Sequence, residues 1–399
     1  MRLKTRIALA FVVLSSSLPT TAAFPPVPKG PEFRINTNTV FSNDSPSIAA
    51  FPDGGFVVVW SGGRARFLDS EGRPVSGEVR LAGVDGVDQI AADRDGSFLV
   101  VWTGGLPNTP ESMIFVRRFN RDGTPRGKRI RASVPSTSDR HDAVVAIGPD
   151  GRLAVAWKSD VPIPGDEVGY ANAVGRIFTA QGTPLTPEIT LRAGEPATSA
   201  GDDTIYVFPS SLALKPSGTL AAVVQETGEC FRRHFVEVPP GGEPSPRFLG
   251  SPFCGGGGPG SSLAMGKDGS LVATWSDSDV QAQRFAPDGR PRGPYFRLSR
   301  EQVSYQDDPV AALQAGGHFV VAWTEEDRDG DGRGIFGRAF SVRGTARTED
   351  FQINTTTAGD QYDPAIAAPR KGPAVVVWTQ SLVENGRTDI FARVLSPNR

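Results

Sequence analysis

The segment FRINTNTVFSNDSPSIAAF (residues 33–51) returns almost unchanged as FQINTTTAGDQYDPAIAAP (residues 351–369). Repetition near both ends of a 399-residue chain indicates a repeated unit, and a repeat constrains the fold before any local pattern is considered. The chain also carries 46 glycines and 34 prolines, which are spread along its length. This composition favours an all-β protein with many tight turns.

Each unit contains a hairpin signal, in which a glycine turn precedes an apolar run, as in PDGGFVVVW (residues 52–60). The turn recurs along the chain at Gly54, Gly96, Gly151, Gly218, Gly269, Gly317 and Gly372. Six residues after these glycines stand, in order, Trp60, Trp102, Trp157, Val224, Trp275, Trp323 and Trp378. Every tryptophan of the chain therefore holds the same repeat position, and the apolar run ahead of each turn supplies the other strand of the hairpin.

A second turn follows in the first six units, as in GTP at Gly123 and at Gly182, so a unit has four strands. The seventh unit ends after its third strand, at residues 390–396, whereas EFRIN at residues 32–36 is a fourth strand with no unit before it. Pairing of 32–36 with 390–396 would close a ring. The sequence thus predicts a seven-bladed β-propeller of four-stranded antiparallel blades, whose last blade is completed by the N-terminal strand. A string of independent sandwiches would leave the divided unit unexplained.

The unit PAIAA, FVVAW, GIFGRAF and FQINTTT resembles the repeats of secreted bacterial β-propeller proteins, some of which are parts of large surface or exported proteins. The resemblance extends from about residue 32 onward and implies the fold. It implies no single activity, because propellers include lectins, hydrolases, lyases and scaffolds.

The first 23 residues have the three-part pattern of a secretory signal: basic residues, an apolar run from Ile7 to Leu14, and small residues up to Ala23. We expect residues 24–31 to form a Pro-rich segment and residues 32–399 a single propeller domain. No second long apolar run follows, so we expect no membrane span and a secreted or periplasmic location.

Charge gives a further constraint on partners. The formal net charge is -2, and loss of Arg2, Lys4 and Arg6 without any acidic residue takes it to -5. No nucleic-acid partner is expected from such a chain. We expect a monomer.

Segments of variable length follow the second and fourth strands of each unit and share one face of a propeller, which we call the variable-loop face; binding residues usually lie on such loops. Asp142, Asp308 and Asp363 each stand nine residues before their turn glycine, near the mouth of the central channel. They are candidates for binding a sugar hydroxyl or a cation; the alternative is that each accepts hydrogen bonds within its own turn. His141, beside Asp142, is a further candidate, against the alternative of a surface histidine.

The loop DRDGDGRG (residues 327–334) places Asp327, Asp329 and Asp331 in alternation, which suits calcium and resembles integrin-type propeller repeats. In those repeats the metal loop joins the first two strands of a blade, whereas here it follows the second strand. The twelfth position is Arg338 instead of glutamate, which excludes an EF-hand. The alternative to a calcium site is a solvated Gly-Asp loop.

The two cysteines, Cys230 and Cys254, would stand at neighbouring ends of the third and fourth strands of one unit, so a disulfide is predicted in an exported protein. The tryptophans are expected to pack between blades instead of stacking on sugars. A basic stripe on the second unit could meet an anionic partner, although outer strands are normally polar and solvated; it consists of Arg117, Arg118, Arg121, Arg126, Lys128, Arg129 and Arg131.

The sequence carries no G-x-S-x-G elbow, H-E-x-x-H motif or P-loop. It therefore favours a binding or interaction module for a glycan or protein ligand over an enzyme. The alternatives are a polysaccharide-active hydrolase or lyase with carboxylates at the channel mouth, and a structural component of the envelope.

Overall fold

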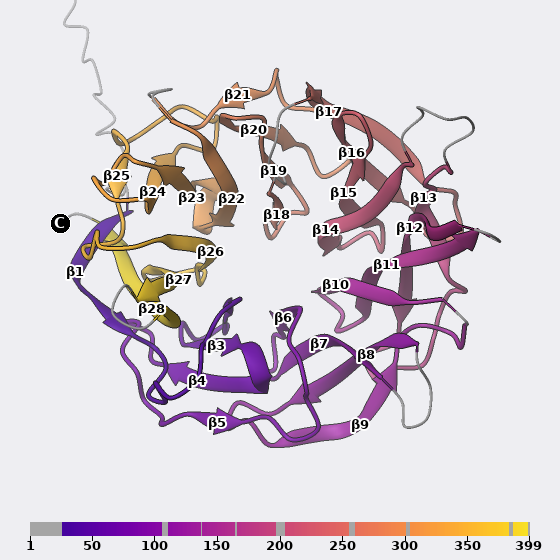
Figure 1. The fold of residues 1–399 in the computed structure, drawn as a ribbon, viewed down its shortest axis with the longest axis horizontal. Helices are drawn as coiled ribbons and strands as arrows, with labels where there is room; N and C mark the ends of the chain where they lie inside the picture. The colour runs from indigo at the N-terminus through magenta and orange to yellow at the C-terminus, as the bar shows by residue number, and fades with distance from the viewer. Residues whose placement is uncertain are drawn as a thin grey trace, which may run out of the picture.

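The computed structural model describes residues 26–105, 111–136, 138–163, 166–196, 204–254, 260–300, 304–382 and 386–397. These residues form a β-propeller, a ring of antiparallel sheets around a central axis (Figure 1). The predicted signal sequence, residues 1–23, lies outside the described residues. In the described ranges no helix is long and apolar enough to cross a membrane.

Four of the sheets follow the chain in order, with the first strand of each nearest the axis. The first two consist of β2 (Ser47–Ala50), β3 (Phe56–Trp60), β4 (Arg64–Leu68) and β5 (Val79–Arg80), and of β6 (Gln89–Ala92), β7 (Phe98–Gly105), β8 (Ser112–Phe119) and β9 (Pro125–Arg131). The other two consist of β18 (Ser261–Met265), β19 (Leu271–Ser276), β20 (Val280–Phe285) and β21 (Phe296–Arg297), and of β22 (Gln306–Leu313), β23 (Phe319–Glu326), β24 (Arg333–Phe340) and β25 (Phe351–Gln352). Short 3₁₀ turns stand at η1 (Ser61–Gly63) and η2 (Ala315–Gly317).

A larger sheet of eight strands lies between the second and third of these. Its strands are β10 (Arg140–Ile147), β11 (Leu153–Ile163), β12 (Asp166–Phe178), β13 (Ile189–Arg192), β14 (Tyr206–Leu214), β15 (Leu220–Thr227), β16 (Phe231–Val238) and β17 (Ser245–Phe253). Within β10–β13 and within β14–β17 every pairing is antiparallel. The two halves meet through a parallel pairing of Ala171 with Tyr206 and a bridge between Glu195 and Ile205.

The closing sheet joins the two ends of the described chain. It consists of β26 (Gln361–Ala367), β27 (Ala374–Leu382), β28 (Arg387–Pro397) and β1 (Pro26–Arg34). Phe33 pairs with Ala392 and Arg34 with Phe391, in antiparallel register. The strand starts earlier than the predicted residue 32, because the Pro-rich segment also pairs with β28 across an irregularity between Lys29 and Phe33.

The repeated Ile-Asn pair of the opening segments has one structural role at both ends of the chain. Ile35 N donates to Ile390 O at 2.7 Å, and Ile390 N donates to Asn36 Oδ1 at 2.8 Å. In the β22–β25 sheet, Ile353 and Asn354 make the same two bonds to Ile335, at 2.7 and 2.8 Å. The side-chain amide thus continues the pairing where the outermost strand ends.

An acidic residue in the outermost strand, or directly before it, links one sheet to the next. Glu32 accepts hydrogen bonds from Thr355 N and Thr356 N at 2.6 and 2.9 Å. The same link joins Glu78 to Asn38 N, Glu188 to Val134 N, and Asp350 to Arg300 N. Neighbouring sheets are therefore fixed to each other by hydrogen bonds as well as by packing.

The turn between the first two strands of each sheet explains the fixed offset from glycine to tryptophan. Phe51 N donates to Gly55 O at 2.7 Å, and Gly54 N donates to Phe51 O at 3.0 Å. Gly54 has a φ of 102°, a region that glycine occupies without the steric cost that a Cβ adds. Because this turn is short and fixed, the strand that follows starts in the same register in each sheet.

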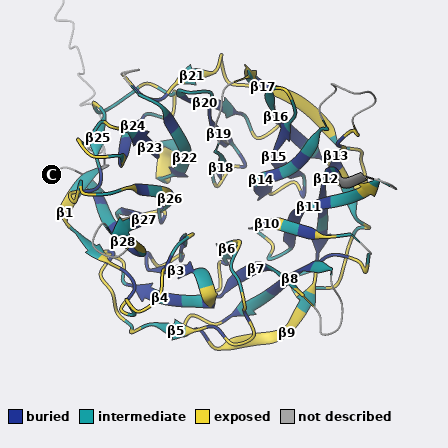
Figure 2. Cartoon of the chain, viewed as in Figure 1, coloured by how far each residue is buried: buried dark blue, intermediate teal, exposed yellow. Residues whose placement is uncertain are grey.

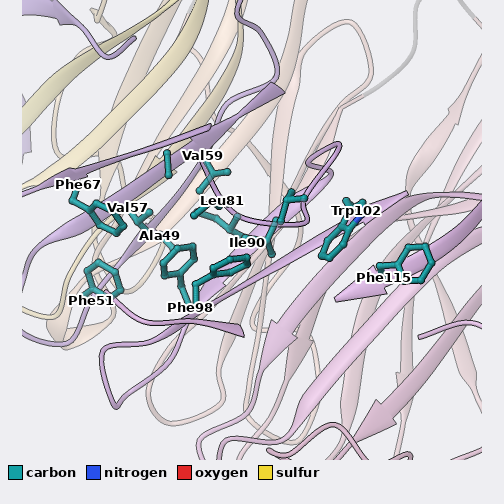
Figure 3. Close-up of a cluster of buried hydrophobic side chains, with 14 of the residues drawn as sticks. Ala49, Phe51, Val57, Val59, Phe67, Leu81, Ile90, Phe98, Trp102 and Phe115 are labelled. Carbon is teal, nitrogen blue, oxygen red and sulfur yellow. The ribbon is translucent and has the colours of Figure 1, made fainter. Parts of the chain in front are cut away.

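Hydrophobic clusters fill the space between neighbouring sheets. Figure 3 shows one of them, in which Ala49 and Val59 of one sheet share a cluster with Phe98 and Trp102 of the next. All six tryptophans are buried, which confirms their predicted packing role. The second strands are apolar at successive positions because both faces of a sheet contact neighbours, whereas outer strands such as β9 are exposed (Figure 2).

A disulfide joins Cys230 to Cys254, as predicted. Cys230 directly precedes β16 and Cys254 directly follows β17, and the adjacent residues Phe231 and Phe253 pair in the sheet. This half of the eight-stranded sheet carries Val224 where the other units carry tryptophan. The covalent link therefore lies in the unit whose core side chain is smallest at that position.

We expect replacement of both cysteines, Cys230→Ser with Cys254→Ser, to lower the free energy of unfolding by about 3 kcal/mol, because the loop they close gains freedom in the unfolded chain. Urea denaturation of the parent and the double variant, each with and without a reductant, measures the difference. The reductant should affect the parent alone. A parent that is equally stable with and without reductant would contradict the expectation.

Candidate functional site

The first strands of the sheets begin around one end of the central channel, on the variable-loop face, and enclose a cavity of about 400 Å³. We call this cavity the acidic mouth. Its lining is mostly polar and includes Ser45, Asp88, Ser210, Gln225, Gly260, Ser261, Asp308 and Asp363. The structure thus brings two of the predicted residues, Asp308 and Asp363, into one cavity.

The backbone explains why these residue types stand at the channel entrance. Ser45, Asp142, Asp308 and Asp363 have φ values of 53°, 56°, 48° and 52°. Asp, Asn and Gly tolerate this left-handed conformation better than most residues do. The register shifts at the same point in β10, β22 and β26. Each of these irregularities turns the chain into its innermost strand.

Asp307 accepts the hydrogen bonds of the turn at the start of β22, and the Asp308 carboxylate is left to face the channel. Its Oδ1 accepts hydrogen bonds from Gly260 N at 2.9 Å, Ser276 Oγ at 2.6 Å and Asp308 N at 2.8 Å. Among hydrogen bonds between described residues, none ends on the Asp308 carboxylate. Asp307, and not Asp308, therefore accepts the hydrogen bonds of this turn.

Crowding of carboxylates changes the protonation of the acidic mouth. Burial, together with the charges of Asp307 and Asp363, raises the pKa of Asp308 to about 8. Burial and the charge of Asp44 also raise the pKa of Asp363. Asp363 keeps more of its surface exposed than the half-buried Asp308, so the effect matters most at Asp308. At neutral pH Asp308 mostly carries its proton and can donate a hydrogen bond.

Hydroxyl and amide groups occupy a further part of the lining. Gln225 Nε2 donates to Ser261 Oγ at 2.9 Å, and the hydroxyls of Ser210 and Ser261 are 2.5 Å apart. These residues come from β14, β15 and β18. The mouth therefore combines carboxyl groups with neutral donors and acceptors.

Asp142 and His141 do not line the cavity. His141 Nδ1 lies 3.0 Å from Asp142 Oδ2, and its Nε2 lies 3.1 Å from Asp160 Oδ2. The hydrogen bonds to Asp142 and Asp160 raise the pKa of His141 to about 9, and the bond from His141 lowers the pKa of Asp142. The histidine is therefore charged at neutral pH, which makes it a poor general base.

The Asp-rich loop at residues 327–332 is held by its own carboxylates. Asn354 Nδ2 donates to Asp329 Oδ2 at 2.7 Å, and Gly359 N donates to Asp331 Oδ2 at 3.1 Å. Asp327 has a φ of 56°, and its N–H donates to Gly332 O. No group of three or more His, Cys, Asp or Glu side chains in the described part of the chain is arranged to hold a metal ion. Calcium binding here stays a prediction.

Three of the seven residues in the basic stripe form ion pairs. Arg118 pairs with Asp93 at 2.5 Å and Arg126 with Asp95 at 2.6 Å, and Arg121 pairs with Asp53. Arg129 lies over the ring of Phe115, 4.2 Å from its centroid. Much of the stripe is thus occupied by contacts within the protein.

The sequence interpretation missed Asp88, Ser210, Gln225 and Ser261 as lining residues. Asp88, Ser210 and Ser261 share one repeat position, eight residues before the turn glycine, so the repeat alignment held a usable signal for them. Gln225 stands at the far end of a second strand, one position beyond Val224. No periodicity distinguishes it from a core residue.

No protein-family model matches the chain, and no curated protein sequence matches it. Among solved structures, a protein of unknown function from Dyadobacter fermentans DSM 18053 is similar over 93% of this chain and 99% of that chain, with a TM-score of 0.52 and 13% identity. BBS1N, in complex with ARL6DN, is similar over 95% of this chain and 98% of that chain, with a TM-score of 0.50 and 9% identity. At these identities the likeness shows the fold alone.

We expect Asp308→Asn to stabilise the protein against unfolding more at pH 8 than at pH 4, by several kcal/mol. An aspartate whose pKa is raised on folding costs nothing below its ordinary pKa near 3.8, and the cost grows as the pH rises to about 8. Asparagine carries no charge at any of these pH values and tolerates the same left-handed backbone. Urea denaturation between pH 4 and pH 9 measures the trend.

Asp142→Asn is the matched control, because it has the same repeat position and backbone but a lowered pKa. Between pH 4 and about pH 6 its stability relative to the parent should stay nearly constant, because a lowered pKa changes stability only as the pH falls below the ordinary value near 3.8. Parallel pH profiles for the two variants would show that the Asp308 carboxyl is not strained by its neighbours.

Proposed function

We propose that this protein is an exported, seven-bladed β-propeller that binds a glycan at the acidic mouth on its variable-loop face. The count of seven treats the eight-stranded sheet as two blades, since β10–β13 and β14–β17 repeat the four-strand pattern of the other sheets and share few pairings. The disulfide and the signal-like N-terminal sequence support export.

The observation that carries the proposal is the chemistry of the cavity lining. Sugar hydroxyls both donate and accept hydrogen bonds, so they suit a mouth in which carboxylates, a protonated carboxyl, hydroxyls and an amide are brought together. A cation would be held less well at neutral pH, because Asp308 then mostly carries its proton. A volume of about 400 Å³ is within the range of small-ligand cavities.

A thermal-shift panel of neutral oligosaccharides tests the proposal. A ligand at about 100 times its dissociation constant should stabilise the parent by about 2.7 kcal/mol. Asp308→Asn and Asp363→Asn should weaken the effect, whereas Asp142→Asn, outside the cavity, should keep it. Shifts that are identical in all three variants would place the ligand elsewhere, and the absence of any shift would favour a protein ligand or a structural role in the envelope.

Repeating the panel in calcium and in chelator tests the Asp-rich loop. If Asp327, Asp329 and Asp331 bind calcium, chelator should lower the melting temperature of the parent, and Asp329→Asn should remove that response. Equal melting temperatures in calcium and chelator would contradict a calcium site.

A second candidate function is cleavage of a polysaccharide, which the raised pKa of Asp308 favours. A carboxyl that keeps its proton at neutral pH could donate it to the leaving oxygen of a glycosidic bond, with Asp363 as the second carboxylate. Turnover would then fall above about pH 8, as Asp308 loses its proton. Assays for new reducing ends and for unsaturated products distinguish hydrolase from lyase, and the absence of products with every glycan that binds would leave binding alone.

A further inference from the structure

A second and larger cavity lies at the opposite end of the channel, where the turns between the first and second strands meet. Its volume is about 700 Å³. Five of these turns contribute lining residues: those between β6 and β7, β10 and β11, β18 and β19, β22 and β23, and β26 and β27. We call it the basic mouth, because four of its lining side chains are cationic: Arg94, Lys267, Arg292 and Arg370.

These cations differ from several other basic residues of the same face. Arg118, Arg126 and Arg152 pair with aspartates of their own or neighbouring turns. Within the part of the chain that the structure describes, the guanidinium and ammonium groups of the four lining cations make no ion pair or hydrogen bond. All four are exposed to the solvent in the cavity. Their charge is therefore available to a ligand.

The acidic residues of the basic mouth do not balance this charge. Asp93 accepts hydrogen bonds from Arg118 Nη1 at 2.5 Å and from Arg94 N at 2.6 Å, so a guanidinium outside the lining already neutralises it. Asp268 accepts from Ser270 N at 3.0 Å and Ser270 Oγ at 2.6 Å. The bond from the Ser270 hydroxyl and, to a smaller extent, the charge of Arg292 lower the pKa of Asp268, so it stays ionised and offsets one of the four cations. An excess of positive charge remains, spread around the opening.

The spacing and the remaining lining restrict the class of anion. The cations come from three separate sheets, so a ligand that meets several of them must carry several negative groups along its length. Ile147, Met265 and Leu313 add apolar surface between them. No aromatic side chain is among the described residues of the lining, so these residues give no platform for stacked bases. The lining consists of turns with no free strand edge, which disfavours an extended peptide.

We propose that the basic mouth binds an acidic oligosaccharide, whose sugars carry carboxylate or sulfate groups. Two to four cations reach the acid groups of successive sugars, while the apolar side chains contact the faces of the rings. The site is separate from the acidic mouth, and its charge is of the opposite sign. An acidic glycan is attracted to one end of the channel and repelled from the other.

Titration calorimetry on the purified protein tests the assignment. The probes are a trimer of galacturonate, a sulfated disaccharide, a neutral oligosaccharide of the same length, and inorganic polyphosphate. We expect the galacturonate trimer or the sulfated disaccharide to bind at 50 mM salt, with an affinity that falls about tenfold or more by 300 mM salt. The neutral oligosaccharide should bind at the basic mouth at least tenfold more weakly.

Two double variants remove the lining charge: Arg94→Gln with Arg370→Gln, and Lys267→Gln with Arg292→Gln. Each should weaken binding at least tenfold. The matched control is Arg290→Gln with Arg343→Gln, which removes two exposed cations from turns near the basic mouth but outside the lining, and it should change affinity less than twofold. Because Asp308→Asn leaves this site untouched, it should bind the acidic probe as the parent does.

Three outcomes would overturn the proposal. One is that neither acidic sugar binds the parent at 50 mM salt. Another is that the control loses as much affinity as the lining variants, which would reduce the effect to net charge. The third is that polyphosphate binds as tightly as the acidic sugars, which would make the site a general anion site and not one for oligosaccharides.

Discussion

Antiparallel pairing between β1 and β28 is the interaction on which the rest of the structure depends. It joins strands more than 350 residues apart and leaves β28 without an open edge. Asp389 strengthens the joint, since it accepts from Asn36 Nδ2 at 2.6 Å and pairs with Arg34 at 3.3 Å. Without the joint the sheets would form an open array, and neither end of the channel would be enclosed. Both cavities are therefore properties of the closed ring and not of any single sheet.

The sequence predicted the propeller well because the constraint that sets it is local and repeated. A compact glycine turn, an apolar strand and a second compact turn recur at fixed offsets, and the divided last unit indicates how the ends meet. The extent of β1 was less predictable. Residues 26–31 read as a Pro-rich segment, yet they pair with β28 because an edge strand needs fewer backbone donors than a central one.

The candidate site was predictable in part, because the place of some residues follows from the repeat, whereas that of others depends on individual side-chain contacts. Asp308 and Asp363 occupy a repeat position whose backbone is left-handed, so their place at the channel entrance follows from the repeat. Asp142 occupies the same position but points its charge to His141, a contact that depends on the side chain next to it and on Asp160 in β11. The raised pKa of Asp308 depends on Asp307 and on a residue of another sheet. Such contacts between units cannot be read from one unit.

The two ends of the channel show how one repeat can produce opposite charges. At the variable-loop end, the left-handed backbone favours aspartate, and several copies face a shared space with few cations to offset them. At the other end, the glycine turns also favour aspartate, but Asp53, Asp93 and Asp95 each meet an arginine from the third or fourth strand or the turn between them.

Because these aspartates are neutralised, the unpaired cations of the turns determine the charge of the basic mouth. Loop length, which indicated the variable-loop face, gives no indication of the basic mouth. Short turns also enclose a cavity when a closed ring holds them apart. The charge of the acidic mouth thus follows from backbone geometry, whereas the charge of the basic mouth follows from which side chains find partners. Of these two causes, only the backbone geometry recurs with the repeat and can be recognised in the sequence of a single unit.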